Sequence, residues 1–407
     1  MRGSLILSIA SLSAFSLRLA APDSHMGSAG TPAAPTTVTY LSVIAIIEKN
    51  GENCDLSIAK NWLQGDHVRI DGDRGRISVG RRGKTLDKLH PREGKIYRYP
   101  FPDKKPKGRR VSTTTIDSHP CEVWMDTDPE QEIRSIQWWA KDVNLPDPLL
   151  GIIITPYDTE PELVVVTAIK EIDVKARPLM DNAFQLPTNL PVEAGKEMEL
   201  FAERDKPAYY HLMPGTVGYF AIQADVRYKE ETFKDAGISA AGLVTISRVW
   251  CRGRQYSRDI PWMVRREQAT TAYIGGLRPD KQEYGFHLNL KEQTARKAAS
   301  LTPLSPLEVL RDLVSSAQPA GAPKRETVRG IDCDAFKLTA SEDATVRRWT
   351  LRNGAEQIGP VNLLVCLADK YRAKPRAIVV HGSGWFEFQE SLPDTLFEVP
   401  SGFRILN

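Results

Sequence analysis

The sequence predicts a mostly antiparallel β protein of the α+β class, built as two tandem curved sheets that each form an incomplete β-barrel. Three observations support this fold class. One set of landmark sequences occurs twice in the same order. Short β-branched runs alternate with turns rich in Gly and Asp along both halves. A capped helical pattern is clear in one segment alone, so few helices are expected to cover the sheets.

The landmarks define the expected domains. Each half carries a Trp-x-x-Gly sequence, a Leu-x-Pro sequence 27 residues after that tryptophan, a tyrosine, a Cys-x-x-aromatic sequence and a closing Phe-x-[Leu/Val]-Pro. They begin at Trp62, Leu89, Tyr97, Cys121 and Phe184 in the first half, and at Trp250, Leu277, Tyr284, Cys333 and Phe397 in the second. We therefore expect a first domain at 38–192 and a second at 218–407, joined by a linker at 193–217.

The first domain is expected to open with the β-branched run 38–47. A hairpin follows, because two β-branched runs flank the Gly- and Asp-containing turn 71–75. Strands are expected at 67–70, 76–79, 95–101, 111–116, 122–126, 133–140, 151–155 and 162–175. The basic, proline-rich loop 102–110 is expected to be a solvated crossover, and binding of an anionic head group is the alternative.

The second domain carries the helix. Ser305 and Glu308 form a capping box with Pro306 at the first helical position. Leu307 and Leu310 then fall on one face, so the helix is expected to lie over the sheet as a lid. The second domain is therefore the better candidate for binding. Its strands are expected at 218–228, 242–252, 282–290, 335–339, 345–352, 361–368 and 376–390.

The N-terminus is typical of an export signal. Arg2 precedes the mostly apolar stretch 5–17, which is short for a membrane-spanning helix. We expect a signal peptide at 1–21 and a linker at 22–37, with a frayed apolar N-terminus as the alternative. Export implies a periplasmic or secreted protein. No other apolar run approaches the length of a transmembrane segment, so none is expected in the mature chain.

Composition excludes several classes of protein. The 407 residues are 41% hydrophobic and 26% charged, which is ordinary for a globular chain and argues against disorder. A net charge of +3 gives no support for a nucleic-acid partner. The five cysteines are an odd number, so at least one stays unpaired even in an oxidising compartment. Cys121 and Cys333 occupy equivalent landmarks and are expected in the core rather than bonded to each other.

The sequence offers no catalytic, cofactor or metal site. The seven histidines show no metal-ligand spacing, and His119, His287 and His381 are expected to be strand or loop residues. Three stretches begin like known motifs, but each lacks an obligatory glycine, spacing or context: the phosphate-loop-like 80–85, the calcium-loop-like 126–130 and the Ser-containing 381–385. We therefore expect no enzymatic activity and no cofactor.

The tryptophans are the candidate cavity residues. Trp138, Trp139, Trp250 and Trp349 lie on expected strands. Together with Trp62, and with Leu307 and Leu310 of the helix, they are candidates for lining an apolar cavity. The alternative is that they fill the core between two layers. Adjacent strand residues face opposite sides of a sheet, so Trp138 and Trp139 cannot both point inward. Arg69 and Arg258, after the two Trp-x-x-Gly sequences, are expected to be exposed or ion-paired.

These landmarks resemble the LolA/LolB-like superfamily of periplasmic lipoprotein carriers, including related exported domains without an assigned role. The resemblance implies strongly curved antiparallel sheets with helices over an apolar cavity, and a lipid or lipoprotein as partner. The chain departs from simple carriers because it is duplicated and its first half is poor in lid helices. The expected function is non-enzymatic binding of a lipid, acyl chain or other apolar ligand. A structural or protein-interaction module of the cell envelope with self-filled barrels is the alternative.

Overall fold

The computed structural model of the protein describes residues 36–48, 51, 53–72, 76–90, 93–157, 162–175, 181–195, 215–229, 243–254, 257–298, 318–319, 321–328, 331–339, 344–352, 361–371 and 374–406. These residues form strands with short connections, and the described helices are two four-residue 3₁₀ turns, η3 (Asp181–Phe184) and η5 (Asp394–Phe397). None of the described helices is long and apolar enough to cross a membrane.

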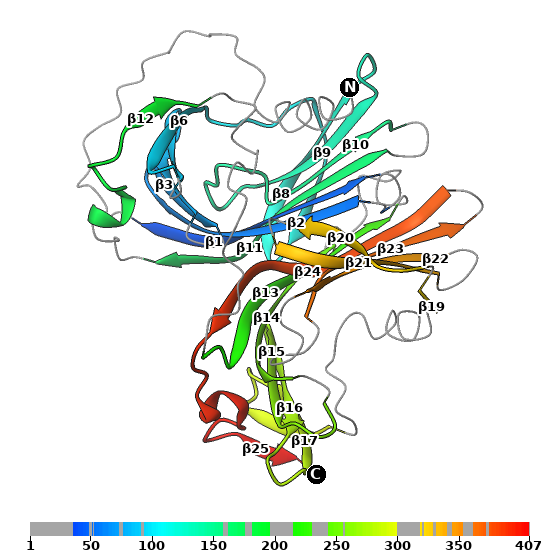
Figure 1. Cartoon of the computed structure of the whole chain (residues 1–407). Helices are drawn as coiled ribbons and strands as arrows, with labels where there is room; N and C mark the ends of the chain where they lie inside the picture. Colours follow the sequence, from blue (N-terminus) through cyan, green and yellow to red (C-terminus); the bar gives the residue numbers. More distant parts are fainter. Residues whose placement is uncertain are drawn as a thin grey trace. The chain divides into compact units, whose positions relative to one another are not determined.

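The first sheet has 12 strands in the order β12-β6-β5-β4-β3-β2-β1-β11-β10-β9-β8-β7. Pairing is antiparallel from β2 to β6 and from β11 to β7, whereas β12 joins β6 in parallel. The strands are β1 (Thr37–Glu48), β2 (Asn53–Gln64), β3 (His67–Gly72), β4 (Ile77–Arg81), β5 (Lys84–His90), β6 (Lys95–Phe101), β7 (Arg109–Ile116), β8 (His119–Asp128), β9 (Ile133–Ala140), β10 (Leu150–Thr155), β11 (Leu163–Lys175) and β12 (Val192–Ala194). Figure 1 shows the sheet curling from β3 to β6, with β12 beside β6.

The second sheet has 13 strands in the order β19-β21-β22-β23-β24-β13-β14-β15-β16-β17-β18-β25, with β20 also on β21. Its one parallel pair joins β18 to β25. The strands are β13 (Gly218–Lys229), β14 (Val244–Gly253), β15 (Trp262–Gln268), β16 (Thr271–Leu277), β17 (Glu283–Asn289), β18 (Thr294–Lys297), β19 (Gln318–Pro319), β20 (Lys324–Val328), β21 (Ile331–Thr339), β22 (Ala344–Leu351), β23 (Asn362–Tyr371), β24 (Lys374–Gln389) and β25 (Arg404–Leu406).

The two sheets follow the same order strand for strand. In each, the first strand (β1 or β13) lies between the second strand and the last long one. In each, a 3₁₀ turn is followed by a three-residue strand that joins the sixth strand in parallel. The architecture confirms the predicted fold class: mostly antiparallel β, in two curved sheets that do not close.

Three of the paired landmarks fall on equivalent strands and two do not. Trp62 and Trp250 lie on β2 and β14, and Cys121 and Cys333 lie on β8 and β21. The closing phenylalanines end the two 3₁₀ turns. In contrast, Leu89 ends β5 whereas Leu277 ends β16, the counterpart of β4. The tyrosines shift in the same way, since β6 carries Tyr97 and β17, the counterpart of β5, carries Tyr284.

The expected strands are present, and several others were not expected. All eight expected strands of the first domain after 38–47 coincide with β3, β4 and β6 to β11, apart from shifts at their ends. Strands β2, β5, β15, β16, β18 and β20 were also not expected, and in β5 and β15 charged residues interrupt the alternation. The short parallel strands β12 and β25 carry no periodic signal at three residues each. Residues 102–107 form the expected exposed crossover without regular structure.

The described residues divide into two compact units that do not follow the sequence halves. Unit 1 comprises Met1–Ser42, Ala59–Pro106 and Ile169–Lys206, and unit 2 comprises Val43–Ile58, Lys107–Ala168 and Pro207–Asn407. Val68 and Tyr99 are buried in unit 1, and Trp138 and Phe386 are buried in unit 2. The predicted signal peptide 1–21 and the predicted helix with Leu307 and Leu310 lie outside the described residues.

Strand β9 illustrates how alternation places the large side chains. Ile136 and Trp138 are each 0% exposed, whereas Gln137 and Trp139 on the other face are half-buried. The indole of Trp139 donates to Gln137 at 2.9 Å. Trp138 pairs across the sheet with Val123, two residues after Cys121, and Trp349 pairs with Ala335, two residues after Cys333. Trp138 and Trp349 are therefore equivalent core residues.

Truncation of Trp138 tests this packing. Trp138→Ala is expected to lower the free energy of unfolding by about 3–5 kcal/mol, because it removes a fully buried aromatic side chain. Trp139→Ala is the matched control on the opposite face, with an expected loss of about 1 kcal/mol. Urea unfolding followed by far-UV circular dichroism measures both. Equal losses would contradict the assignment of Trp138 alone to the core.

Candidate functional site

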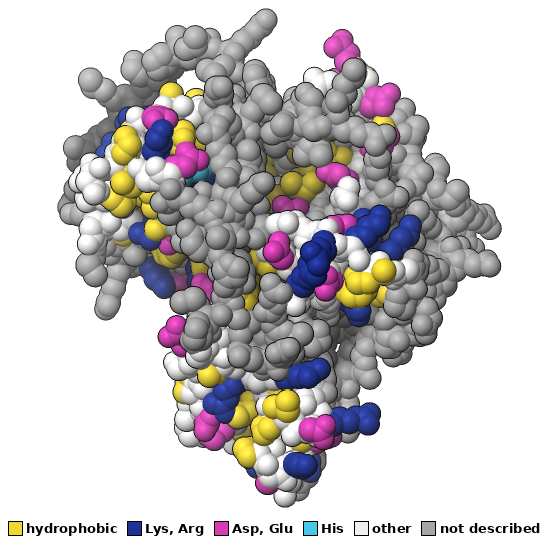
Figure 2. Space-filling view, viewed as in Figure 1, with side chains coloured by type: hydrophobic (Ala, Val, Ile, Leu, Met, Phe, Trp, Pro, Cys, Tyr) yellow, Lys and Arg dark blue, Asp and Glu magenta, His cyan; other side chains and the backbone are white. Residues whose placement is uncertain are grey.

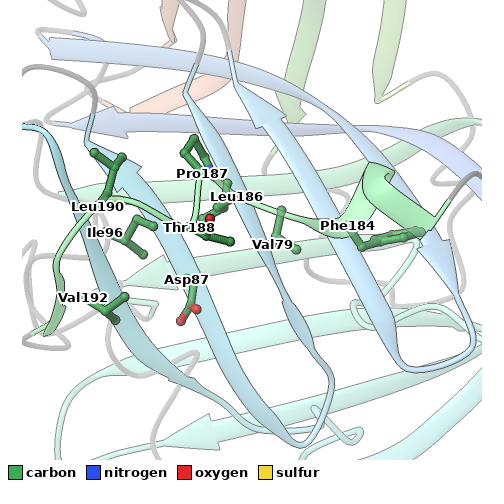
Figure 3. A pocket seen from close by; sticks show the side chains of 9 residues that line it. All are labelled: Val79, Asp87, Ile96, Phe184, Leu186, Pro187, Thr188, Leu190 and Val192. Atoms are coloured by element: carbon green, nitrogen blue, oxygen red, sulfur yellow. The ribbon is translucent and has the colours of Figure 1, made fainter.

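A half-open groove of about 210 Å³ lies in unit 1, between the sheet and the segment that follows η3. Val79, Asp87 and Ile96 come from the neighbouring strands β4, β5 and β6. Figure 3 shows the side chains of these three close to the segment that carries Phe184, Leu186, Pro187, Thr188, Leu190 and Val192. Seven of the nine lining side chains are apolar, the exceptions being Asp87 and Thr188, whereas polar atoms, backbone included, form slightly more than half of the exposed lining surface.

Backbone pairing holds the segment against the sheet. The amide of Ile96 donates to the carbonyl of Pro191 at 2.9 Å, and Gly195 donates to Arg98 at 2.8 Å. Gly195 also explains why the chain can lie so close. A Cβ there would be 2.2 Å from the ring of Tyr99, which no side chain could occupy. The segment 185–195, called the closing segment below, is therefore a fixed wall of the groove.

The carboxylate in the groove is already paired. Arg98 donates to both oxygens of Asp87, at 2.7 and 2.8 Å. Hydrogen bonding to Asp87 raises the pKa of Arg98. This bidentate pair leaves the groove with little uncompensated charge.

An arginine ties the 3₁₀ turn to the sheet in unit 1. Arg69 of β3 pairs across the sheet with Trp62, and its guanidinium lies 5.6 Å from the centre of that indole. It donates to both carboxylate oxygens of Asp71, at 2.8 and 3.0 Å. Its remaining amino group donates to the carbonyl of Ala183 in η3 at 2.8 Å. One side chain thus fixes the start of the segment that walls the groove.

The second sheet repeats this arrangement with Arg265. This residue pairs with Trp250 across the sheet, donates to Glu267 at 2.7 Å, and donates to the carbonyl of Leu396 in η5 at 3.0 Å. We call Arg69 and Arg265 the clamp arginines. As expected, Arg69 is ion-paired and Arg258 is exposed, but Arg258 lies in the turn between β14 and β15 and is not the structural counterpart of Arg69. That turn places Arg265 15 residues after Trp250, whereas Arg69 follows Trp62 by 7.

The candidate cavity residues do not meet at this groove. The described lining contains none of Trp62, Trp138, Trp139, Trp250 and Trp349. Trp138 and Trp349 are buried, and Trp349 donates to Glu326 at 2.6 Å. Trp62 and Trp250 are half-buried, and the ring of Trp250 lies 5.1 Å from Phe220. The groove residues were missed because the closing Phe-x-[Leu/Val]-Pro sequence was treated only as a landmark of the repeat.

A buried polar network lies on β13, β14, β15 and β24 in unit 2. His381 contacts Asp225 at 2.6 Å, and the two side chains are 7% and 2% exposed. Gln223 donates to Ser383 at 3.3 Å and accepts from Arg266 at 2.9 Å. Burial raises the pKa of Asp225, but His381, Arg266 and Arg227 lower it by more, so Asp225 stays ionised below its usual range.

This network does not amount to a catalytic site. His381 bonded to a carboxylate is half of a Ser-His-Asp arrangement, but the hydroxyl of Ser383 accepts from Gln223 and Ser383 is 1% exposed. The described residues hold no cluster of three or more metal-ligating side chains. Figure 2 shows Lys and Arg mixed with Asp and Glu over the described part of the visible face, which is unlike a concentrated basic surface.

Comparisons with known proteins assign no family. No family model and no curated protein matches the chain. A DUF1329 family protein from Desulfovibrio piger is 12% identical, with 45% of this chain and 90% of that chain covered and a TM-score of 0.24. The Pseudomonas aeruginosa MucA/MucB complex gives 11% identity, coverage of 62% and 87%, and a TM-score of 0.26. PNGF-II is 8% identical, with 86% of this chain and 66% of that chain covered and a TM-score of 0.28. Likenesses this weak single out no fold family.

Removal of a clamp arginine is expected to release its 3₁₀ turn. Arg265→Gln loses the bonds to Leu396 and Glu267, so the free energy of unfolding is expected to fall by about 2–3 kcal/mol. Arg265→Gln is also expected to raise backbone hydrogen exchange in residues 394–406. Arg69→Gln is expected to raise it in residues 181–194. Arg110→Gln is the control, because its pair with Glu122 is exposed and is worth about 0–1 kcal/mol. Unchanged exchange in both segments would refute the clamp.

The Asp225–His381 pair predicts a pH-dependent loss of stability. Because the pKa of Asp225 is lowered on folding, its contribution is complete above the unfolded value of about 3.9 and is lost as the pH falls through the folded value. Asp225→Asn is expected to cost about 2 kcal/mol at pH 7 and progressively less below about pH 4. Urea unfolding at pH 7 and pH 3 measures this. Asp173→Asn, from an exposed pair with Lys175, is expected to change little at either pH.

Proposed function

We propose that the protein is an exported, non-enzymatic module of two lipoprotein-carrier-like sheets that binds an apolar group in the groove of unit 1. The groove itself carries this proposal. Seven of its nine lining side chains are apolar, and it is walled by a segment that the backbone and Arg69 hold in place. The identical strand order of the two sheets supports a duplication of one module. The N-terminal pattern 1–21 supports export to the periplasm or beyond.

The size of the groove limits the ligand. Pockets for drug-sized molecules are about 300–1,000 Å³, and the groove is smaller at about 210 Å³. It therefore suits the end of an acyl chain rather than a whole lipid. Each methylene that it removes from water contributes about 0.8 kcal/mol, or about fourfold in affinity. The ion pair between Asp87 and Arg98 at its floor discourages a charged ligand end.

The absence of a reactive group in the described lining supports a non-enzymatic role. Asp87 and Thr188 carry the polar side-chain atoms of that lining, and Asp87 already accepts two bonds from Arg98. A general acid or base needs an accessible proton-transfer atom aimed at the ligand, and a bidentate ion pair withholds it.

A structural or protein-interaction module is the second candidate. The complete burial of Trp138 and the near-complete burial of Trp349 favour it, because these side chains fill the space that a larger cavity would need. Such a module would bind an envelope protein rather than a lipid. The two candidates differ in whether the groove takes up an alkyl chain in solution.

A chain-length series tests acyl binding. Saturated fatty acids of increasing length, titrated calorimetrically into the purified full chain, are expected to bind about fourfold more tightly per added methylene. The gain is expected to stop at medium chain length, when the groove is full. Leu190→Trp is expected to weaken binding at least about tenfold by occupying the groove.

Val174→Trp is the matched control, since Val174 is 54% exposed in the same unit and outside the groove lining. It is expected to leave binding unchanged. Absence of binding at every chain length would reject the acyl proposal and favour the interaction module. Binding that Leu190→Trp leaves intact would place the site elsewhere.

A further inference from the structure

Two cysteines from different sheets meet in unit 2. Cys54 lies near the start of β2, and Cys366 lies at the centre of β23. The Cys366 thiol is near enough to Cys54 to raise its pKa. Both residues belong to unit 2, which contains 43–58 as well as 207–407. Both are thiols in the structure, and Cys54 is the partly exposed member, whereas Cys366 is 1% exposed.

A second contact with the same spacing supports this meeting point. Ile58 of β2 lies so close to Gly384 of β24 that a Cβ on the glycine would be 2.2 Å from Ile58 Cγ1. Cys54 is four residues before Ile58, and Val380 is four residues before Gly384. Val380 pairs across the sheet with Cys366. If β2 continues along β24 in the same direction, at about 3.3 Å per residue over four residues, Cys54 lies over the Val380–Cys366 pair.

We propose that Cys54 and Cys366 form a disulfide that covalently joins the first sheet to the second once the chain is exposed to an oxidant. The bond would link residues 312 positions apart in the sequence. Packing of Ile58 on Gly384 holds this part of β2 close to β24. The proposal does not depend on acyl binding.

The oxidant is a small disulfide such as oxidised glutathione. The thiolate of Cys54 attacks one sulfur of the glutathione disulfide, which releases one glutathione thiolate and leaves a mixed disulfide on Cys54. The thiolate of Cys366 then attacks the Cys54 sulfur and releases the second glutathione. Two protein thiols are oxidised to one disulfide, two glutathione thiols are formed, and the two thiol protons go to solvent or to glutathione.

The pKa of Cys54 controls the rate of the first step. Burial and then the neighbouring Cys366 thiol raise the pKa of Cys54, whereas Arg347 lowers it. The thiolate is the attacking form, so oxidation is expected to accelerate as the pH rises above neutrality.

The other three cysteines are expected to remain thiols. Cys121 and Cys333 each contact the backbone carbonyl two residues earlier in their own strand, at 3.4 and 3.3 Å. Burial raises the pKa of Cys121 to about 11 and that of Cys251 to about 12, so neither is a ready nucleophile at neutral pH. They provide matched controls within the same chain.

The test is a thiol map of the purified full chain. Folded protein is treated with oxidised glutathione at pH 8, quenched, denatured and alkylated with N-ethylmaleimide. Non-reducing digestion and mass spectrometry are expected to yield one cross-linked peptide pair that contains Cys54 and Cys366. Three alkylated cysteines are expected per chain. Five alkylated cysteines, or Cys54 bonded to a different cysteine, would overturn the proposal.

Single substitutions sharpen the result. Cys366→Ser is expected to trap glutathione on Cys54, and Cys54→Ser is expected to give four alkylated cysteines with no cross-link. Cys121→Ser is expected to leave the Cys54–Cys366 bond intact. If Cys366→Ser does not fold, the wild-type map and the partly exposed Cys54→Ser still decide the question. A cross-link that survives Cys54→Ser would refute the assignment.

Discussion

The groove depends on one interaction: the hydrogen bond from a clamp arginine to a backbone carbonyl of the 3₁₀ turn. In both sheets the guanidinium also donates to a carboxylate two residues further along its own strand. This bond orients the guanidinium toward the turn. The turn then directs the chain along the sixth strand, where it adds a short parallel strand. This anchor adds to the backbone bonds between the short strand and the sixth strand, which are few because each short strand contains only three residues.

The sequence predicted the parts of the fold that have a period. Long strands with alternating β-branched residues were recovered, and Trp138 and Trp139 were correctly expected on opposite faces. Spacing along the chain was a poorer guide, because an insertion between β14 and β15 moved Leu277 and Arg258 out of register with their counterparts. The signal that identifies Arg265 is chemical rather than positional: an arginine followed two residues later by a carboxylate, as at Arg69 and Asp71. The groove could not be predicted, since its wall has no regular structure.

The two sheets share a frame and differ in what they bury. The second places a histidine, an aspartate, a glutamine and an arginine at its centre, where burial of charge is costly unless every group is paired. In the first, Asn61 and Ser42 form a single neutral contact within unit 1. A duplicated architecture thus tolerates very different interiors, because strand order is set by backbone pairing and the side chains of one face can diverge independently.

The central position of the first strand in each sheet has a kinetic consequence. Strand β13 pairs with β24, and the residues that meet, such as Gly218 and Gln389, are 171 positions apart. Until that late strand is present, β13 offers a bare edge bordered by buried residues such as Ala221, Ala224 and Val226. Pairing across such a distance is slow, and an open apolar edge is where chains add to one another. Each sheet of this topology therefore passes through an aggregation-prone stage, in which its first strand is formed but the late strand that pairs with it is not.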